Sequence, residues 1–205
     1  MVETRNEPYS DGDRINRLPD AIIHHILSFD IDTKHVVQTS VLSKRWIHIW
    51  KSIPNLNIDR RSFPQGKEHT QRFIYFADMV LRDDSDIRRF HLHWDSFDHD
   101  DENVANNVNM WIVHAVKRNV QQVIVEICQY YHHLAYEIPH QLLNCKSLRT
   151  LRIQLNAGAR HAAQVTFPKL MDLPRLEVLS LAGFSVYDVE LSLFMLSTSP
   201  RIRHI

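Results

Sequence analysis

Apolar side chains recur at helical spacing in three short segments between residues 15 and 58, which predicts three short helices. Pro19 and Asp20 suit a first helical turn, because proline lacks the donor left unpaired there and a carboxylate favours the positive helix end. Thr33 and Ser43 are typical N-caps for the second and third helices. The apolar positions are Ile22, Ile23, Ile26, Leu27 and Phe29 in the first helix, Val36, Val37 and Val41 in the second, and Trp46, Ile47, Ile49, Trp50 and Ile53 in the third.

This predicted helical block carries more apolar surface than it can bury by itself. The apolar stripe of its first helix is roughly 160° wide at about 100° per residue, which is broad for so short a helix. Its second helix is rich in β-branched residues, which are mediocre helix formers and depend on packing. Because about forty-five residues supply little core of their own, we expect a partner protein or a docked neighbouring domain to cover part of the block.

An internal repeat occupies the chain after residue 60. Four segments share one template of apolar, two free, apolar, one free and apolar positions: IRRFHL from Ile87, VQQVIV from Val120, LRTLRI from Leu148 and LEVLSL from Leu176. A fifth segment, IRHI, begins at Ile202. The spacing of about 26 to 33 residues between starts is typical of leucine-rich repeats.

Each repeat predicts a short strand with one buried face, and stacking the repeats predicts a parallel sheet. Helical patterns at residues 73–81 and 104–116 predict helices between the strands. Later connections contain Pro168 and Pro174, which indicates irregular turns. The predicted fold class is therefore α/β.

Side chains at the free positions of the strands would line the uncovered face of the sheet. Two interpretations remain open for this face: an ordinary solvated surface, or a surface that recognises another protein. Under the second interpretation, the candidate target-binding residues are His91, His93, Ile124, Glu126, Arg152, Gln154 and Ser180.

Composition narrows the classes of function. The 205 residues include 24 basic and 24 acidic side chains, a balance that does not indicate nucleic acid or another acidic polymer as ligand. Four glycines are too few for the glycine-rich loops that bind nucleotides. With two cysteines, no charged and apolar leader and no long apolar run, we expect a soluble intracellular protein of the nucleus or cytoplasm.

Three kinds of site are disfavoured by their surroundings. Trp46 and Trp50 lie one helical turn apart among isoleucines, which favours packing over base stacking. The fourteen histidines, including His91 and His93, show no zinc-ligand spacing. Cys128 falls at a repeat turn, where a small buried residue is more typical than a nucleophile. No catalytic residue, metal or cofactor is predicted.

The segments LPDAIIHHILSF from Leu18, VVQTSVLSKRWIHIW from Val36 and IPNLNID from Ile53 resemble the F-box of plant F-box proteins with leucine-rich repeats. In that family, Leu-Pro-Asp opens the motif, Thr-Ser-Val-Leu-Ser-Lys-Arg-Trp closes it, and Pro-Asn-Leu leads into the repeats. Residues 1–13 are polar, poor in apolar side chains and rich in turn formers, which predicts a disordered tail. The resemblance implies a three-helix F-box at 14–59 and a C-terminally incomplete leucine-rich-repeat solenoid at 60–205, with helices and turns on its convex side.

The resemblance also implies a function without catalysis. The F-box would dock onto the Skp-type adaptor of a cullin-RING ubiquitin ligase, and the repeats would hold the protein to be ubiquitylated. The adaptor-binding residues implied by position are Leu18, Pro19, Ile22, Ile26, Leu27, Val36, Val37, Val41 and Trp46.

Two departures from the family pattern leave questions open. Asp30 and Asp32 stand where the family usually has Leu-Pro; they weaken docking if they lie in the centre of the apolar surface and do nothing if they stay solvated. The sequence ends at Ile205, within a repeat strand, so we expect a truncated product or fragment. A competing hypothesis is a non-catalytic repeat scaffold, or a decoy that binds the adaptor without delivering a target.

Overall fold

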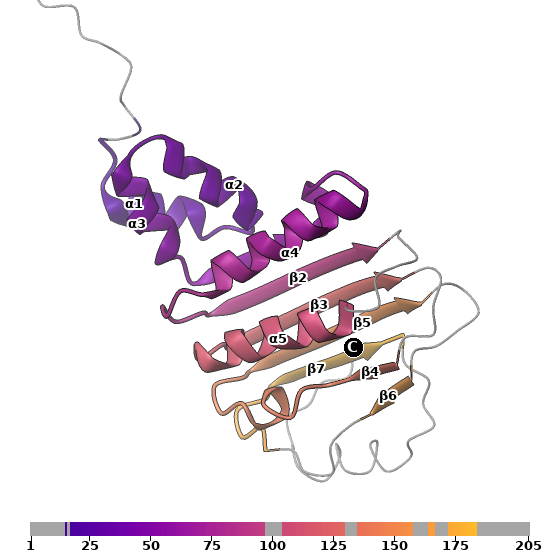
Figure 1. Cartoon of the computed structure of the whole chain (residues 1–205). Coiled ribbons are helices and arrows are strands. Elements are labelled where there is room, and N and C mark those ends of the chain that lie inside the picture. The colour runs from indigo at the N-terminus through magenta and orange to yellow at the C-terminus, as the bar shows by residue number, and fades with distance from the viewer. Residues whose placement is uncertain are drawn as a thin grey trace, which may run out of the picture.

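The computed structural model describes residues 15, 17–96, 104–129, 135–157, 164–166 and 172–183. Within them, a small helical block precedes a larger part in which helices pack on a parallel sheet (Figure 1). The predicted tail, the turn at Pro168 and the fifth repeat lie outside the described residues.

The helical block contains three α-helices, as the apolar spacing predicts: α1 (Asp20–Leu27), α2 (Thr33–Gln38) and α3 (Lys44–Lys51). Val41 lies in a 3-10 turn, η2 (Thr39–Val41), rather than in α2 itself. The small core of the block consists of Ile23, Leu27, Val36, Trp46, Ile49, Trp50 and Ile53.

The N-cap of α2 differs from the prediction. Asp32 caps the helix, with its carboxylate accepting a hydrogen bond from the backbone N–H of Lys34 at 2.7 Å. Thr33 is instead the first helical residue, and its buried hydroxyl accepts the backbone N–H of Asn57 at 2.8 Å. Aspartate is an excellent cap, so the threonine hydroxyl is free to join the helical block to the first strand.

The sheet has five parallel strands in the order β1-β2-β3-β5-β7. The last four coincide with the four repeats, and their register pairs His91 with Ile124, Ile124 with Arg152, and Arg152 with Ser180. This register confirms the repeat alignment residue by residue. The strands are β1 (Asn55–Asp59), β2 (Arg89–Ser96), β3 (Gln122–Gln129), β5 (Thr150–Ala157) and β7 (Val178–Ala182).

Three strands were not anticipated from the repeat template. The segment NLNID forms β1 and pairs with β2. A segment that the resemblance assigned to the F-box therefore contributes a strand to the sheet. A second, two-stranded parallel sheet joins β4 (Ala135–Glu137) to β6 (Gln164–Thr166). β4 and β6 have three residues each, too few for an alternation that stands out in the sequence, whereas β1 alternates polar and apolar residues along its whole length.

Two helices, α4 (Lys67–Leu81) and α5 (Val104–Lys117), lie on one side of the sheet (Figure 1). Both occur where the helical patterns predict them. Beneath them, the rings of Phe73, Trp94 and Trp111 pack together with centroids 5.2 to 5.8 Å apart. The arrangement of strand, helix and parallel strand is compatible with a leucine-rich-repeat solenoid, and it leaves the opposite face of the sheet uncovered by these helices.

Candidate functional site

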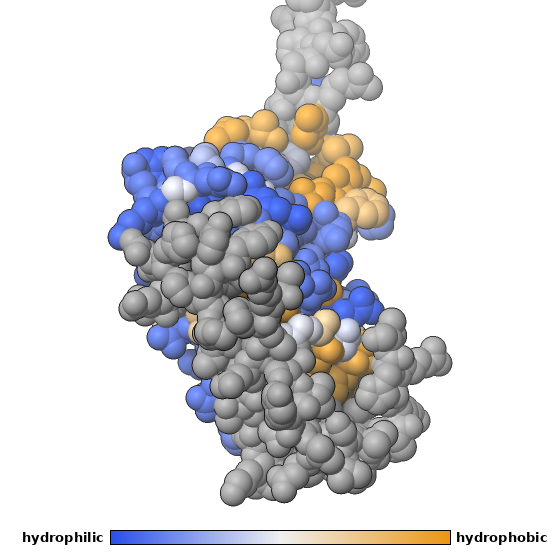
Figure 2. All heavy atoms as spheres, turned by 90° about the vertical axis from the view of Figure 1, so that its right-hand side faces the viewer, coloured by the Kyte–Doolittle hydropathy of each residue, from blue (hydrophilic) through white to orange (hydrophobic). Residues whose placement is uncertain are grey.

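The helical block exposes a large share of its apolar side chains. Seven of the ten large hydrophobic side chains that are most exposed in the described part of the chain belong to this block. In Figure 2, hydrophobic surface gathers over the upper part of the molecule, where the block lies. With their exposed fractions, the seven are Ile15 (55%), Ile22 (46%), Ile26 (44%), Phe29 (59%), Val41 (85%), Leu42 (48%) and Ile47 (37%).

The nine predicted adaptor-binding residues divide by burial. Pro19, Ile22, Ile26 and Val41 are exposed, and Leu18 and Val37 are partly buried. Leu27, Val36 and Trp46 are buried within the block, with at most 7% of their surface exposed. In this structure these three residues pack in the core of the block and hold its helices together. The adaptor-binding role of all nine remains a prediction.

Four exposed apolar residues of the block are missing from that set: Ile15, Phe29, Leu42 and Ile47. The sequence contained a signal for Phe29, because it follows Ile22 and Ile26 at helical spacing and so belongs to the same predicted apolar stripe; in the structure it lies just beyond the end of α1. Leu42 belongs to the segment TSVLSKRW, which carries the family resemblance.

Two segments that carry the resemblance meet in space. Arg45, just before Trp46, donates a hydrogen bond to the backbone oxygen of Leu18 at 2.6 Å and forms an ion pair with Asp20. The start of α3 is thereby attached to the start of α1. These residues therefore have a structural role in the block.

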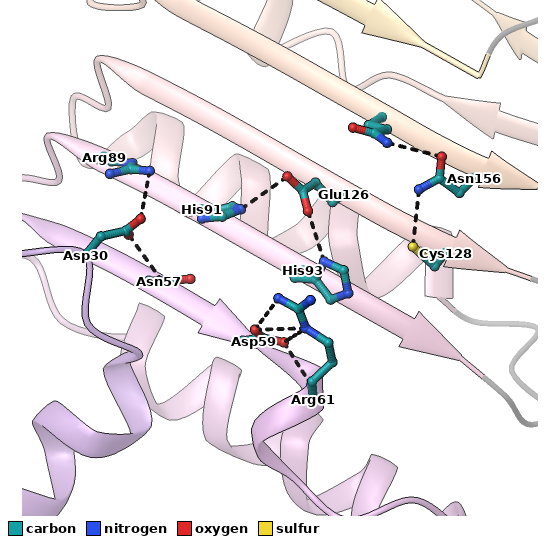
Figure 3. Close-up of polar contacts among 11 residues, drawn as sticks. Asp30, Asn57, Asp59, Arg61, Arg89, His91, His93, Glu126, Cys128 and Asn156 are labelled. Carbon is teal, nitrogen blue, oxygen red and sulfur yellow. Dashed lines mark hydrogen bonds and ion pairs between the residues drawn. The ribbon is translucent and has the colours of Figure 1, made fainter.

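The acidic residues of the loop between α1 and α2 face the sheet. Asp30 accepts hydrogen bonds from Asn57 at 3.2 Å and from Arg89 at 3.4 Å (Figure 3). Asp32 caps α2 and accepts a hydrogen bond from the hydroxyl of Ser62. Their partners lie on β1, on β2 and in the turn that follows β1, so both carboxylates join the helical block to the sheet.

The uncovered face of the sheet contains a hollow of about 280 Å³. Six of the seven predicted target-binding residues line it, together with Arg89 and Ala182, which stand at free positions of the same repeats. The seventh, His93, lies beside it and contacts Glu126. The lining residues brought together from the predicted set are His91, Ile124, Glu126, Arg152, Gln154 and Ser180.

Glu126 lies between two histidines in this part of the face (Figure 3). Its carboxylate is 3.0 Å from Nδ1 of His93 and 3.7 Å from Nε2 of His91. Burial lowers the pKa of His91 below its ordinary value, although the charge of Glu126 opposes this shift. The His91 ring is therefore uncharged at neutral pH.

A second ionic group lies at the end of β1. Burial opposes the charge of Asp59, but hydrogen bonds from the side chain and backbone of Arg61 prevail and lower the pKa of Asp59. The sheet face is not uniformly basic, because Glu126 lines the hollow together with Arg89 and Arg152. Among the described residues, no three His, Cys, Asp or Glu side chains lie close enough together to hold a metal ion.

Comparison with curated proteins gives significant matches to F-box proteins of Arabidopsis thaliana. The chain is 38% identical to F-box/LRR-repeat protein At3g58930 over 154 residues, which are 69% of this chain and 31% of that protein. It is 32% identical to F-box/LRR-repeat protein 13, over 82% of this chain and 35% of that protein. It is 28% identical to FBD-associated F-box protein At3g52670, over 98% of this chain and 44% of that protein.

The chain belongs to the plant F-box/LRR-repeat family. It spans about a third of the length of the F-box/LRR-repeat relatives that it matches. No family model matches it, and no solved structure matches it. In the described part of this F-box/LRR-repeat chain, no helix has both the length and the apolar character needed to cross a membrane.

Proposed function

We propose that the chain is a substrate-recognition subunit of a Skp-cullin-F-box ubiquitin ligase. The three-helix block is the F-box and binds the Skp-type adaptor, and the uncovered face of the sheet binds the target protein. The chain performs no catalysis itself. Its contribution is to raise the effective concentration of a target lysine near the charged conjugating enzyme.

The observation that carries the proposal is the exposed apolar surface of the helical block. Ile22 and Ile26 of α1 and Phe29, two residues beyond its end, are exposed, while Ile23 and Leu27 fill the block's own core. An exposed apolar cluster of this kind is typical of a protein-binding site. The family's F-box proteins generally act in ubiquitin ligases, and that role needs such a docking surface.

Asp30 and Asp32, which replace the family's usual Leu-Pro, are compatible with this docking. The carboxylate of Asp30 accepts hydrogen bonds from Asn57 and Arg89 of the sheet, and that of Asp32 accepts one from Lys34 within α2 and one from Ser62 after β1. They are therefore directed toward the remainder of the chain and place no uncompensated charge among the exposed isoleucines.

Co-expression of the full chain with a plant Skp-type adaptor tests the proposal. We expect a stable complex, and we expect the double change Ile22→Glu and Ile26→Glu to weaken it. Each isoleucine has about half of its surface left to bury, which is worth about 1 kcal/mol per side chain, and two such terms correspond to roughly 30-fold in Kd. Burying two carboxylates adds to this loss.

The matched control is Tyr75→Glu with Met79→Glu. These residues are also exposed and also four positions apart, but they lie on α4, outside the helical block. The control is expected to bind the adaptor with unchanged Kd. The proposal is refuted if the wild-type chain forms no complex, or if the two double variants lose affinity equally.

A further inference from the structure

The hollow on the uncovered sheet face contains polar groups that have no partner in the described part of the chain. Nε of Arg89 and both ring nitrogens of His91 are inaccessible to solvent and make no hydrogen bond. Among the described residues, Arg89 contacts Asp30 from its terminal nitrogen at 3.4 Å, and a carboxylate oxygen of Glu126 is 3.7 Å from Nε2 of His91. Buried donors are nearly always paired in native proteins, so the Nε–H of Arg89 and the single N–H of the uncharged His91 ring indicate a missing acceptor.

Arg152 adds a positive charge to the same hollow. It lies on β5, exposed, in the cross-strand row that runs from His91 through Ile124 to Arg152 and Ser180. In the described part of the chain, its guanidinium forms no ion pair or hydrogen bond. A guanidinium in this position is suited to a planar acceptor with two oxygens, which it binds through two parallel hydrogen bonds.

The charge balance distinguishes between classes of anion. Arg89 is already ion-paired with Asp30, and Glu126 lies against His91 and His93. Among the described residues, Arg152 is therefore the guanidinium of the hollow that has no carboxylate partner. A carboxylate brings one negative charge to this guanidinium, whereas a phosphate monoester brings about 1.5 to 2 and is repelled more strongly by Glu126.

We propose that this hollow binds the carboxylate side chain of an aspartate or glutamate of the target protein, with Arg152 as the principal contact and Arg89 and His91 as additional donors. Gln154 and Ser180, which also line the hollow, supply neutral hydrogen-bonding groups at its edge. This inference rests on the proposed function, because it specifies what the target-binding face recognises.

The test uses the full chain labelled with ¹⁵N-arginine and follows the Nε–H signals of Arg89 and Arg152 by NMR. The probe is glutamate blocked at both backbone ends, and blocked glutamine is its uncharged counterpart. A single carboxylate contact implies a Kd in the millimolar range, so the titration extends to about 50 mM. We expect saturable shifts of both signals with blocked glutamate and at least fivefold weaker binding of blocked glutamine.

The decisive variant is Arg152→Gln, which removes the charge without adding an anion. We expect it to weaken binding of blocked glutamate about tenfold, the effect of losing one charge-assisted contact. Arg175→Gln is the matched control, because Arg175 is exposed in the turn before β7 and does not line the hollow. We expect this control to leave the affinity unchanged.

Three results would overturn the inference. One is equal binding of blocked glutamate and blocked glutamine, another is equal loss in Arg152→Gln and Arg175→Gln, and the third is tighter binding of blocked phosphoserine than of blocked glutamate, which would assign the hollow to phosphate. Adaptor binding is measured on the same preparations. Adaptor binding without glutamate binding refutes this inference alone, whereas glutamate binding without adaptor binding refutes the proposed ligase role.

Discussion

Trp94 and Trp111 provide a controlled measurement of what a buried hydrogen bond contributes to this fold. Both indole rings are buried, both contact Phe73, and their centroids lie 5.6 Å apart. Nε1 of Trp111 donates to Asp78 at 2.7 Å, whereas Nε1 of Trp94 is buried without a partner. Changing each to phenylalanine therefore removes the same atoms from similar surroundings but only one hydrogen bond.

The expected magnitudes follow from this difference. Each change leaves a comparable gap in the core, which costs a similar amount in both variants. Trp111→Phe also loses a hydrogen bond to a carboxylate, worth about 1.5 to 3 kcal/mol. Trp94→Phe removes a buried unpaired N–H, whose desolvation costs about 1 to 3 kcal/mol. We expect Trp111→Phe to be less stable than Trp94→Phe by about 2 kcal/mol or more.

Urea denaturation followed by far-ultraviolet circular dichroism measures the free energy of unfolding of both variants without depending on tryptophan fluorescence. A difference of this size corresponds to a Tm about 4 to 8 °C lower for Trp111→Phe in a chain of this length. Equal free energies of unfolding for the two variants would refute the reasoning. The result bears on the sheet face as well, because Trp94 anchors the strand that carries His91 and His93.

Two further predictions concern ionisable groups. Burial lowers the pKa of His91 below 6.5, so the unfolded chain binds a proton at this residue at a higher pH than the folded chain does. The contribution of His91 to the free energy of unfolding is therefore fully present above about pH 7 and is lost as the pH falls through about 6.5. His91→Gln should flatten this dependence in urea denaturation, with exposed His114→Gln as control. Asp32→Ala should lower the free energy of unfolding by about 1 kcal/mol or more through loss of the helix cap. Asp30→Ala should lower it by less than about 1 kcal/mol, because the Asp30 side chain is 55% exposed.

Distinct outcomes would contradict these predictions. A pH dependence that persists unchanged in His91→Gln would show that the histidine is not the group responsible. Equal stability losses in Asp30→Ala and Asp32→Ala would contradict the assignment of the cap to Asp32. Impaired adaptor binding in either aspartate variant, with its fold intact, would mean that the loop contributes to the docking surface.

The sheet was predictable in detail because the signals that specify its strands lie within short segments of the sequence. Apolar and free positions alternate within each repeat, so each strand has a defined buried face, and repeats of one template stack in one register. The pairing of Arg89, Gln122, Thr150 and Val178 in one cross-strand row follows from this alignment. The strand formed by NLNID carries the same signal, because IPNLNI from Ile53 follows the repeat template and Leu56 and Ile58 are buried, although its position inside the segment that resembles the F-box concealed it.

The sequence by itself determined that this chain has three short helices, a parallel sheet of leucine-rich repeats and an excess of apolar surface at its N-terminal end. The tertiary structure decided which side chains form that surface. Ile22 and Ile23 belong to one apolar stripe, yet Ile23 is buried and Ile22 is exposed, because α3 packs against only part of the stripe. It also brought Arg89 and Arg152 to one hollow, since groups 63 positions apart in the sequence meet only when the strands between them have paired.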